Sequence, residues 1–392
     1  MTSQRGFSLS SWESVAAAVE KSNERDEEAR IALAKAYAAR QVRREQLLAQ
    51  TAAIDRSTAK YSVLDRDGEC PVIRIRRNFI RLSTARPRQE DESWPGSAEE
   101  RLKADVATRP PLTKLIHRPG NALQAYLSML YVAQVEVEPG ARWRNERDNN
   151  GPGGWGELFG LLAPDTLNKE LNLRVTRALT RLAEHDLVRV GKERTRNRFD
   201  RFTLFREDKR QVYLAPSETA SRSLPTAFFT AGWHLVLDNR EMATLLAVVD
   251  QTGRPRARRD AHEVGEALPE SVRWRYYGLA PEAFAARHEL EEFGLIENAD
   301  PMERLHGKLS DKQREEGLRA PRITLKLDGF DFGRPAIDVV KDKLAATPVP
   351  PHRMDHARTV GLLDKHGLWR GPAPTGRPPA AAARGGRTPR RG

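Results

Sequence analysis

The chain has 392 residues, 66 of them lysine or arginine against 54 aspartate or glutamate, so its formal net charge is +12. This length allows two or three globular domains, and no apolar run is long enough to span a membrane. Since the first residues also lack an apolar stretch of signal-peptide length, we expect a soluble, cytoplasmic protein that binds polyanions, with nucleic acid favoured over membrane. The single cysteine, Cys70, excludes an internal disulfide and a cysteine-based zinc site.

Residues 1–60 are predicted to form a helical arm. From Ser11 to Lys60 the sequence is rich in Ala, Glu, Arg, Gln and Lys and contains no Gly or Pro, which favours one or two long helices. The larger apolar residues keep no strict heptad. Two roles therefore stay open, a solvated arm and a helix that pairs in a homodimer.

Residues 61–110 are predicted to be a β-hairpin and a polar linker. The turn residues Arg66–Glu69 separate two short apolar stretches, and the second of these alternates Ile with Arg. The linker, Ser83–Pro111, is polar and contains proline.

Residues 111–215 show the order helix, helix, helix, hairpin. Apolar residues at helical spacing predict helices over Asn121–Val137 and Asn168–His185, with a short helix between them after the Gly-rich loop Asn149–Gly156. Two short apolar stretches then flank the basic turn Gly191–Asn197, as expected of a β-hairpin.

Residues 220–346 repeat this order, with a predicted third helix over Ala280–Phe293 that begins at Pro281 and stops at Gly294. A final short helix is predicted over Ala336–Ala345. A shift of 108 residues aligns five pairs of apolar residues and predicts an internal repeat: Leu171 with Leu279, Ala178 with Ala286, Leu182 with Leu290, Leu187 with Leu295, and Val188 with Ile296.

Residues 347–392 are predicted to be a disordered basic tail rich in Pro, Gly and Arg. Gly371–Gly392 holds five arginines and no acidic residue, and its composition cannot bury a core.

The stretch LNLRVTRALTRLAEHDLVRVGKERTRNRF, from Leu171 to Phe199, resembles the third helix and wing of winged-helix DNA-binding domains. Two such modules in a basic chain are also similar, in architecture, to plasmid replication initiators. The resemblance implies a mainly α fold with small β-hairpins, in which two winged-helix domains follow the helical arm.

Twelve residues are predicted to contact double-stranded DNA. Thr166–Arg210 carries thirteen basic against seven acidic residues, and the polar faces of its helix and turn present side chains suited to phosphates and base edges. The predicted contacts are Lys169, Asn172, Arg174, Thr176, Arg177, Thr180, Arg181, Lys192, Arg194, Arg196, Arg198 and Arg201.

The second module has the opposite charge over its presumed third helix and turn. Gly278–Asp300 holds six acidic residues and one arginine, so phosphates should repel it and we expect it to contact protein, in a dimer or with a partner. The preceding loop is basic and is predicted to make a secondary DNA contact through Arg254, Arg256, Arg258 and Arg259.

The sequence offers no convincing catalytic or metal-binding constellation. The nucleotide-binding motif GxxxxGK[ST] and the zinc motif HExxH are both absent, and His352 with His356 is better explained as a solvated loop beside prolines. We therefore expect no enzymatic activity, cofactor or metal. The favoured function is sequence-specific DNA binding, as a plasmid-type replication initiator or a transcriptional regulator. The alternative is a protein-interaction adaptor whose basic tail binds nonspecifically.

Overall fold

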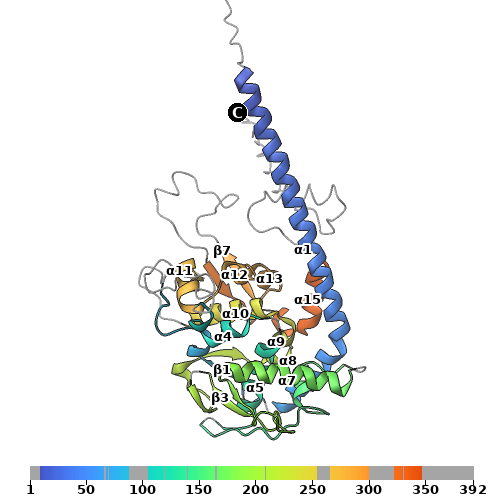
Figure 1. Cartoon of the computed structure of the whole chain (residues 1–392), viewed down its shortest axis with the longest axis vertical. Helices are drawn as coiled ribbons and strands as arrows, with labels where there is room; N and C mark the ends of the chain where they lie inside the picture. The colour runs from blue at the N-terminus through green and yellow to red at the C-terminus, as the bar shows by residue number, and fades with distance from the viewer. Residues whose placement is uncertain are drawn as a thin grey trace, which may run out of the picture. The chain divides into compact units, whose positions relative to one another are not determined.

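The computed structural model is mainly helical, with small antiparallel sheets (Figure 1). It describes residues 9–65, 68, 70–87, 105–118, 120–138, 140–163, 166–207, 209–253, 265–299, 322–329 and 331–346. These residues belong to two compact units. The larger unit holds residues 44–299 and 322–343, and the smaller unit holds residues 9–43 and 344–346.

Helix α1 (Leu9–Leu64) confirms the predicted helix and continues four residues past Lys60. Its last turns belong to the larger unit and are anchored by polar side chains. Ser57 and Tyr61 are both fully buried, and their hydroxyls donate to the carbonyl oxygen of Leu158 at 2.9 and 2.7 Å. No helix among the described residues is long and apolar enough to cross a bilayer.

The prediction of a β-hairpin after residue 60 is wrong. Tyr61 still belongs to α1, because the helical turn buries its ring against Tyr131, at a centroid distance of 4.9 Å. The second predicted strand does form, as β1 (Val72–Arg76), but it pairs antiparallel with β5 (Ser221–Pro225). The short helix α2 (Arg77–Ile80) follows β1.

The two longer helices predicted for residues 111–215 are confirmed, with small shifts at their ends, whereas the short helix predicted between them lies earlier, over Trp155–Leu158 at the end of the Gly-rich loop. A three-stranded antiparallel sheet of order β2-β3-β4 follows the last of them, and an isolated bridge joins Arg142 to Leu214. The elements are α4 (Pro111–Leu115), α5 (Ala122–Val135), α6 (Trp155–Leu158), α7 (Asn168–Glu184), β2 (Val188–Arg189), β3 (Thr203–Arg206) and β4 (Lys209–Val212).

Residues 220–346 also contain a three-stranded antiparallel sheet, of order β6-β8-β7, but its strand β6 lies between α10 and α11, ahead of the third helix. The third helix, predicted over Ala280–Phe293, is divided in two because the backbone tightens to i→i−3 hydrogen bonds around Ala286. The elements are η1 (Glu218–Ala220), α8 (Ala227–Thr230), α9 (Trp233–Val236), α10 (Asn239–Thr252), β6 (Glu266–Ala267), α11 (Glu270–Val272), η2 (Arg273–Tyr277), α12 (Pro281–Phe284), α13 (Arg287–Glu292), β7 (Ile296–Ala299), β8 (Arg322–Leu325), η3 (Asp331–Gly333) and α15 (Ala336–Ala345).

The helix-to-strand junctions of the two halves are built from the same hydrogen bonds. Asp186 and Gly294, which the 108-residue shift aligns, both have positive φ, at 58° and 77°. Around each, two amides bond back into the helix end: Leu187 N to Leu182 O (3.0 Å) and Asp186 N to Ala183 O (3.1 Å), and Leu295 N to Leu290 O (2.9 Å) and Gly294 N to Glu291 O (3.0 Å). The two positions that the 108-residue shift aligns therefore share a backbone conformation.

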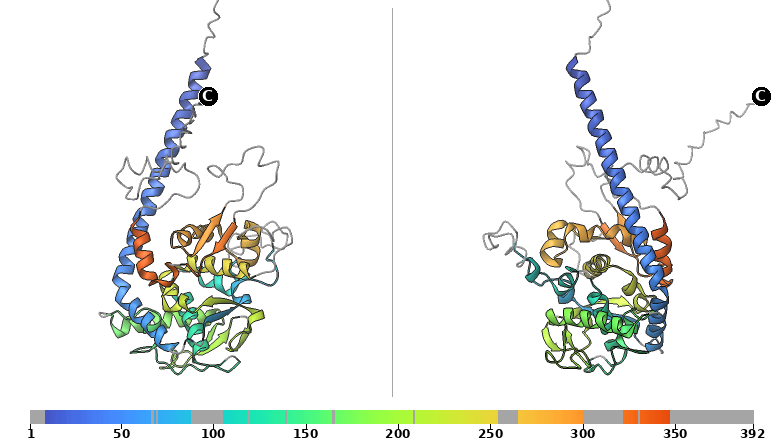
Figure 2. Two further views of the ribbon diagram at one scale, coloured as in Figure 1. Left: turned by 180° about the vertical axis from the view of Figure 1, so that it is seen from behind. Right: turned by 45° about the vertical axis from the view of Figure 1, so that its right-hand side comes forward.

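A buried carboxylate lies where α10 meets α2 and β5. Asp250, on α10, is fully buried and accepts a hydrogen bond of 2.7 Å from the Tyr277 hydroxyl. Arg222 of β5 approaches it at 3.1 Å, Arg77 of α2 at 3.6 Å and Arg81 at 3.9 Å. The two three-stranded sheets lie at opposite ends of the larger unit, the first green and the second orange in Figure 2.

Candidate nucleic-acid interface

Helix α7 buries the apolar stripe expected from its sequence. Leu171, Val175, Ala178, Leu179 and Leu182 are at most 2% exposed. The remaining faces carry the predicted contact residues, of which two are exposed and five are half-buried: Lys169 and Arg177, then Asn172, Arg174, Thr176, Thr180 and Arg181.

Three cations of α7 make no ion pair with any other described residue: Lys169, Arg174 and Arg177. Arg181 differs from them, since it lies 2.9 Å from the Glu184 carboxylate and donates a hydrogen bond of 3.1 Å to the Lys114 carbonyl oxygen. Arg181 therefore links α7 to α4 through its side chain.

The predicted basic turn is the tip of a longer loop, Gly191–Phe202, which we call the wing loop. The amide of Gly191 donates to the Arg198 carbonyl at 2.6 Å and closes its base. Four cations of the loop are exposed and unpaired among the described residues: Lys192, Arg194, Arg196 and Arg201. Arg198 instead lies 3.9 Å from Glu193 and over the Phe199 ring.

The Gly-rich loop positions the wing loop, a role that the sequence did not indicate. The side-chain amide of Asn149 is buried and donates to the carbonyl oxygen of Phe199 at 3.2 Å. Close by, the Trp155 ring packs on Phe202, with centroids 5.4 Å apart. A Cβ at Gly156 would lie 2.6 Å from the Leu171 side chain, so this glycine allows α6 to approach α7.

A pocket of about 330 Å³ opens beside the base of the wing loop, and four arginines line it with no acidic residue among the lining residues. All four are exposed and form no ion pair with described residues: Arg142, Arg144, Arg189 and Arg201. We call this the four-arginine groove. Only Arg201 was predicted, because the other residues come from the segment before α6 and from β2; the alternation of Trp and Arg at Arg142–Arg144 was the available signal.

A second basic cluster lies where α4 meets the end of α7. Lys114, Arg118 and Arg181 gather there with His185, whose pKa is lowered to about 4, first by burial and then by Arg181 and Lys114. Burial also lowers the pKa of Lys114. The imidazole of His185 is consequently neutral at pH 7, and the positive charge comes from the longer side chains.

The predicted secondary contacts, Arg254, Arg256, Arg258 and Arg259, lie outside the described residues, as does the basic tail. Among the acidic side chains of the second module, Glu282 and Glu297 are exposed. The described residues contain no group of three or more His, Cys, Asp or Glu side chains placed to hold a metal ion.

Comparisons with known proteins give no family for this chain: no family model, curated protein or solved structure matches it.

Proposed function

We propose that this protein binds double-stranded DNA sequence-specifically and that residues 111–215 act as a winged helix. Helix α7 enters the major groove with Arg174 and Arg177 toward base edges, while the wing loop follows the phosphate backbone. The protein then serves as a plasmid-type replication initiator or a transcriptional regulator, working in the cytoplasm as a homodimer, and residues 220–346 form a second winged helix.

The observation that carries this proposal is the contrast between paired and unpaired arginines. Several arginines in the interior of the larger unit have carboxylate partners: Arg76 pairs with Glu207, and Arg86 and Arg109 both pair with Asp105. The arginines of the four-arginine groove have none among the described residues. Since unpaired guanidinium groups collected on one surface attract an anion, a phosphate backbone is the partner that fits them best.

The proposal is tested by selecting bound duplexes from a random pool at about 150 mM salt, where binding through phosphates alone is weakened. We expect one enriched sequence. Direct repeats of it would favour an initiator, and an inverted repeat a regulator. The tail, Gly371–Gly392, should be deleted in a parallel experiment so that its charge cannot supply the binding.

Two variants separate base readout from backbone binding on the selected duplex. R174A/R177A should weaken the binding free energy for the selected duplex by about 1–3 kcal/mol for each base that is no longer read, and it should relax the sequence preference. R142Q/R144Q/R189Q should weaken binding to all duplexes alike. The slope of the logarithm of the binding constant against the logarithm of the salt concentration should become shallower by about 0.9 for each phosphate that is no longer bound. R240Q, which removes an exposed arginine on α10, is the matched control and should bind normally.

An adaptor would behave differently in the same assays. Its DNA binding would disappear with the tail and would be insensitive to both variants, and no sequence would be enriched. That combination of results would contradict the proposal.

A further inference from the structure

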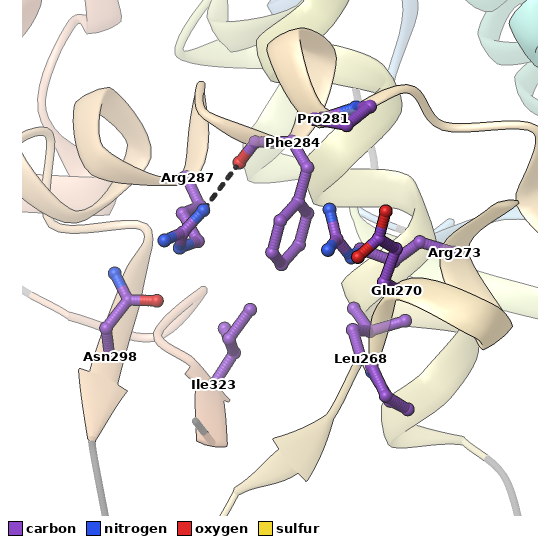
Figure 3. A pocket seen from close by; sticks show the side chains of 9 residues that line it. Leu268, Glu270, Arg273, Pro281, Phe284, Arg287, Asn298 and Ile323 are labelled. Carbon is purple, nitrogen blue, oxygen red and sulfur yellow. Dashed lines mark hydrogen bonds between the residues drawn. The ribbon is translucent and has the colours of Figure 1, made fainter. Parts of the chain in front are cut away.

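A pocket of about 410 Å³ opens in the second half of the larger unit, between α11, α12, α13 and the ends of β7 and β8 (Figure 3). Its walls are largely apolar, with Leu268, Pro269, Pro281, Phe284 and Ile323. The polar side chains that line it are Glu270, Arg273, Arg287 and Asn298.

Two guanidinium groups bracket the buried ring of Phe284. The Cζ atom of Arg273 lies 4.0 Å from the ring centroid and that of Arg287 lies 4.7 Å from it, and Figure 3 shows them on opposite sides of the ring. Arg287 also donates a hydrogen bond of 3.3 Å to the Phe284 carbonyl oxygen. The ring therefore holds both cations at the pocket.

Neither guanidinium forms an ion pair with the residues that the structure describes. No carboxylate oxygen among them lies within 4.0 Å of Arg273 or Arg287, and the Nε atom of Arg273 is buried without a hydrogen-bond partner. Burial lowers the pKa of both side chains, and the carboxylates of Glu270 and Glu291, which lie farther than 4.0 Å away, offset this shift only in part. Since desolvating a cation without an adjacent counter-ion is unfavourable, this arrangement lowers the stability of the unliganded protein and favours an anion in the pocket.

The shape and the walls restrict the anion. A pocket of this size suits a small molecule rather than a polymer, and its apolar surface suits a hydrophobic body. We propose that the pocket binds a small organic acid, with its oxyanion, a carboxylate or a phosphate, on Arg287, on the side of the Phe284 ring away from Glu270, and its apolar body against Leu268 and Ile323. The site is separate from α7 and the wing loop, so the inference does not depend on DNA binding.

Binding is tested on the full chain with three probes of similar shape. Benzoate and phenyl phosphate carry the two kinds of oxyanion, and benzamide is the neutral counterpart of benzoate. We expect one or both anions to raise Tm and to give saturable heat in titration calorimetry, with dissociation constants of about 1 mM or below, and benzamide to do neither. The stronger of the two anions identifies the natural head group.

Variants distinguish a binding site from a structural arrangement. R273M and R287M keep an apolar stem against Phe284 but remove the charge. R287M should lose at least tenfold in anion affinity and R273M less, while the Tm of the unliganded protein stays equal or rises in both, and R240Q should bind as the unaltered chain does. If R273M and R287M lower the Tm of the unliganded protein and leave anion binding unchanged, the arginines are structural and the proposal is overturned. It is likewise overturned if neither anion binds at about 10 mM, or if benzamide binds as well as benzoate.

Discussion

At the scale of single residues, His234 shows how burial alone sets a protonation state. This side chain of α9 is fully buried among aromatic rings, with the centroid of Tyr61 at 4.7 Å and that of Phe229 at 4.9 Å. Burial lowers its pKa from 6.5 to about 3. The folded protein therefore keeps this imidazole neutral at every pH at which a free histidine would begin to charge.

We predict that His234 makes the protein sensitive to acid. The pKa of His234 is lower in the folded than in the unfolded state. Above pH 6.5 the imidazole is neutral in both states, so it does not reduce the free energy of unfolding. As the pH drops from 6.5 toward 3, the unfolded state takes up the proton more readily, and the folded state loses stability. In H234L, urea unfolding measured between pH 7.5 and pH 4 should show a shallower loss of stability. An unchanged slope would mean that other groups account for the acid sensitivity.

At the scale of elements, the two matching helix ends use different residues for one backbone conformation. Position 186 holds aspartate at φ 58°, and position 294 holds glycine at φ 77°. Glycine adopts positive φ without steric cost, whereas a residue with a Cβ adopts it only at a steric cost. There is room for a methyl group at Gly294, whose Cβ would lie 3.6 Å from the nearest atom, so a substitution there would test the backbone alone.

We predict that both positions prefer glycine to alanine by about 1 kcal/mol. At position 186 the comparison is between D186G and D186A, because both variants lose the 2.7 Å ion pair with Arg210 and differ only in the Cβ. At position 294 it is between the unaltered chain and G294A. Chemical denaturation measures all four proteins, and equal stability of D186G and D186A would refute the conformational explanation.

Elements formed by local sequence could be predicted, and those formed by distant partners could not. The ranges of α5 and α7 followed from apolar periodicity, because an α-helix satisfies its backbone hydrogen bonds within one segment. Strand β1 was assigned to the wrong partner because its true partner, β5, lies far along the chain. The four-arginine groove was missed for the same reason, since Arg142 and Arg189 approach each other only in the folded unit.

At the scale of the whole molecule, charge as well as packing joins residues 220–346 to the segment that follows β1. Asp250 of α10 faces Arg77 and Arg81 of that segment, and Arg222 on β5. One buried carboxylate thus neutralises part of a cluster of three guanidinium groups. Its loss would leave these cations facing one another in a poorly solvated place.

We therefore predict that D250N destabilises the larger unit by about 3–5 kcal/mol. The control is D338N, which removes a half-exposed carboxylate 3.1 Å from Lys341 and should cost less than about 1 kcal/mol. Urea unfolding followed by circular dichroism measures both variants. Equal losses of unfolding free energy in D250N and D338N would show that the buried Asp250 carboxylate does not stabilise the larger unit more than a surface carboxylate does.

The pairing of β1 with β5 also has a consequence for synthesis on the ribosome. Val72 is opposite Pro225, so β1 emerges about 150 residues before the strand that completes its hydrogen bonds. At roughly 5–20 residues per second, the nascent chain waits on the order of ten seconds or longer with this apolar edge unsatisfied. During that interval β1 is a natural target for a chaperone, and a slower codon before Ser221 would lengthen its exposure.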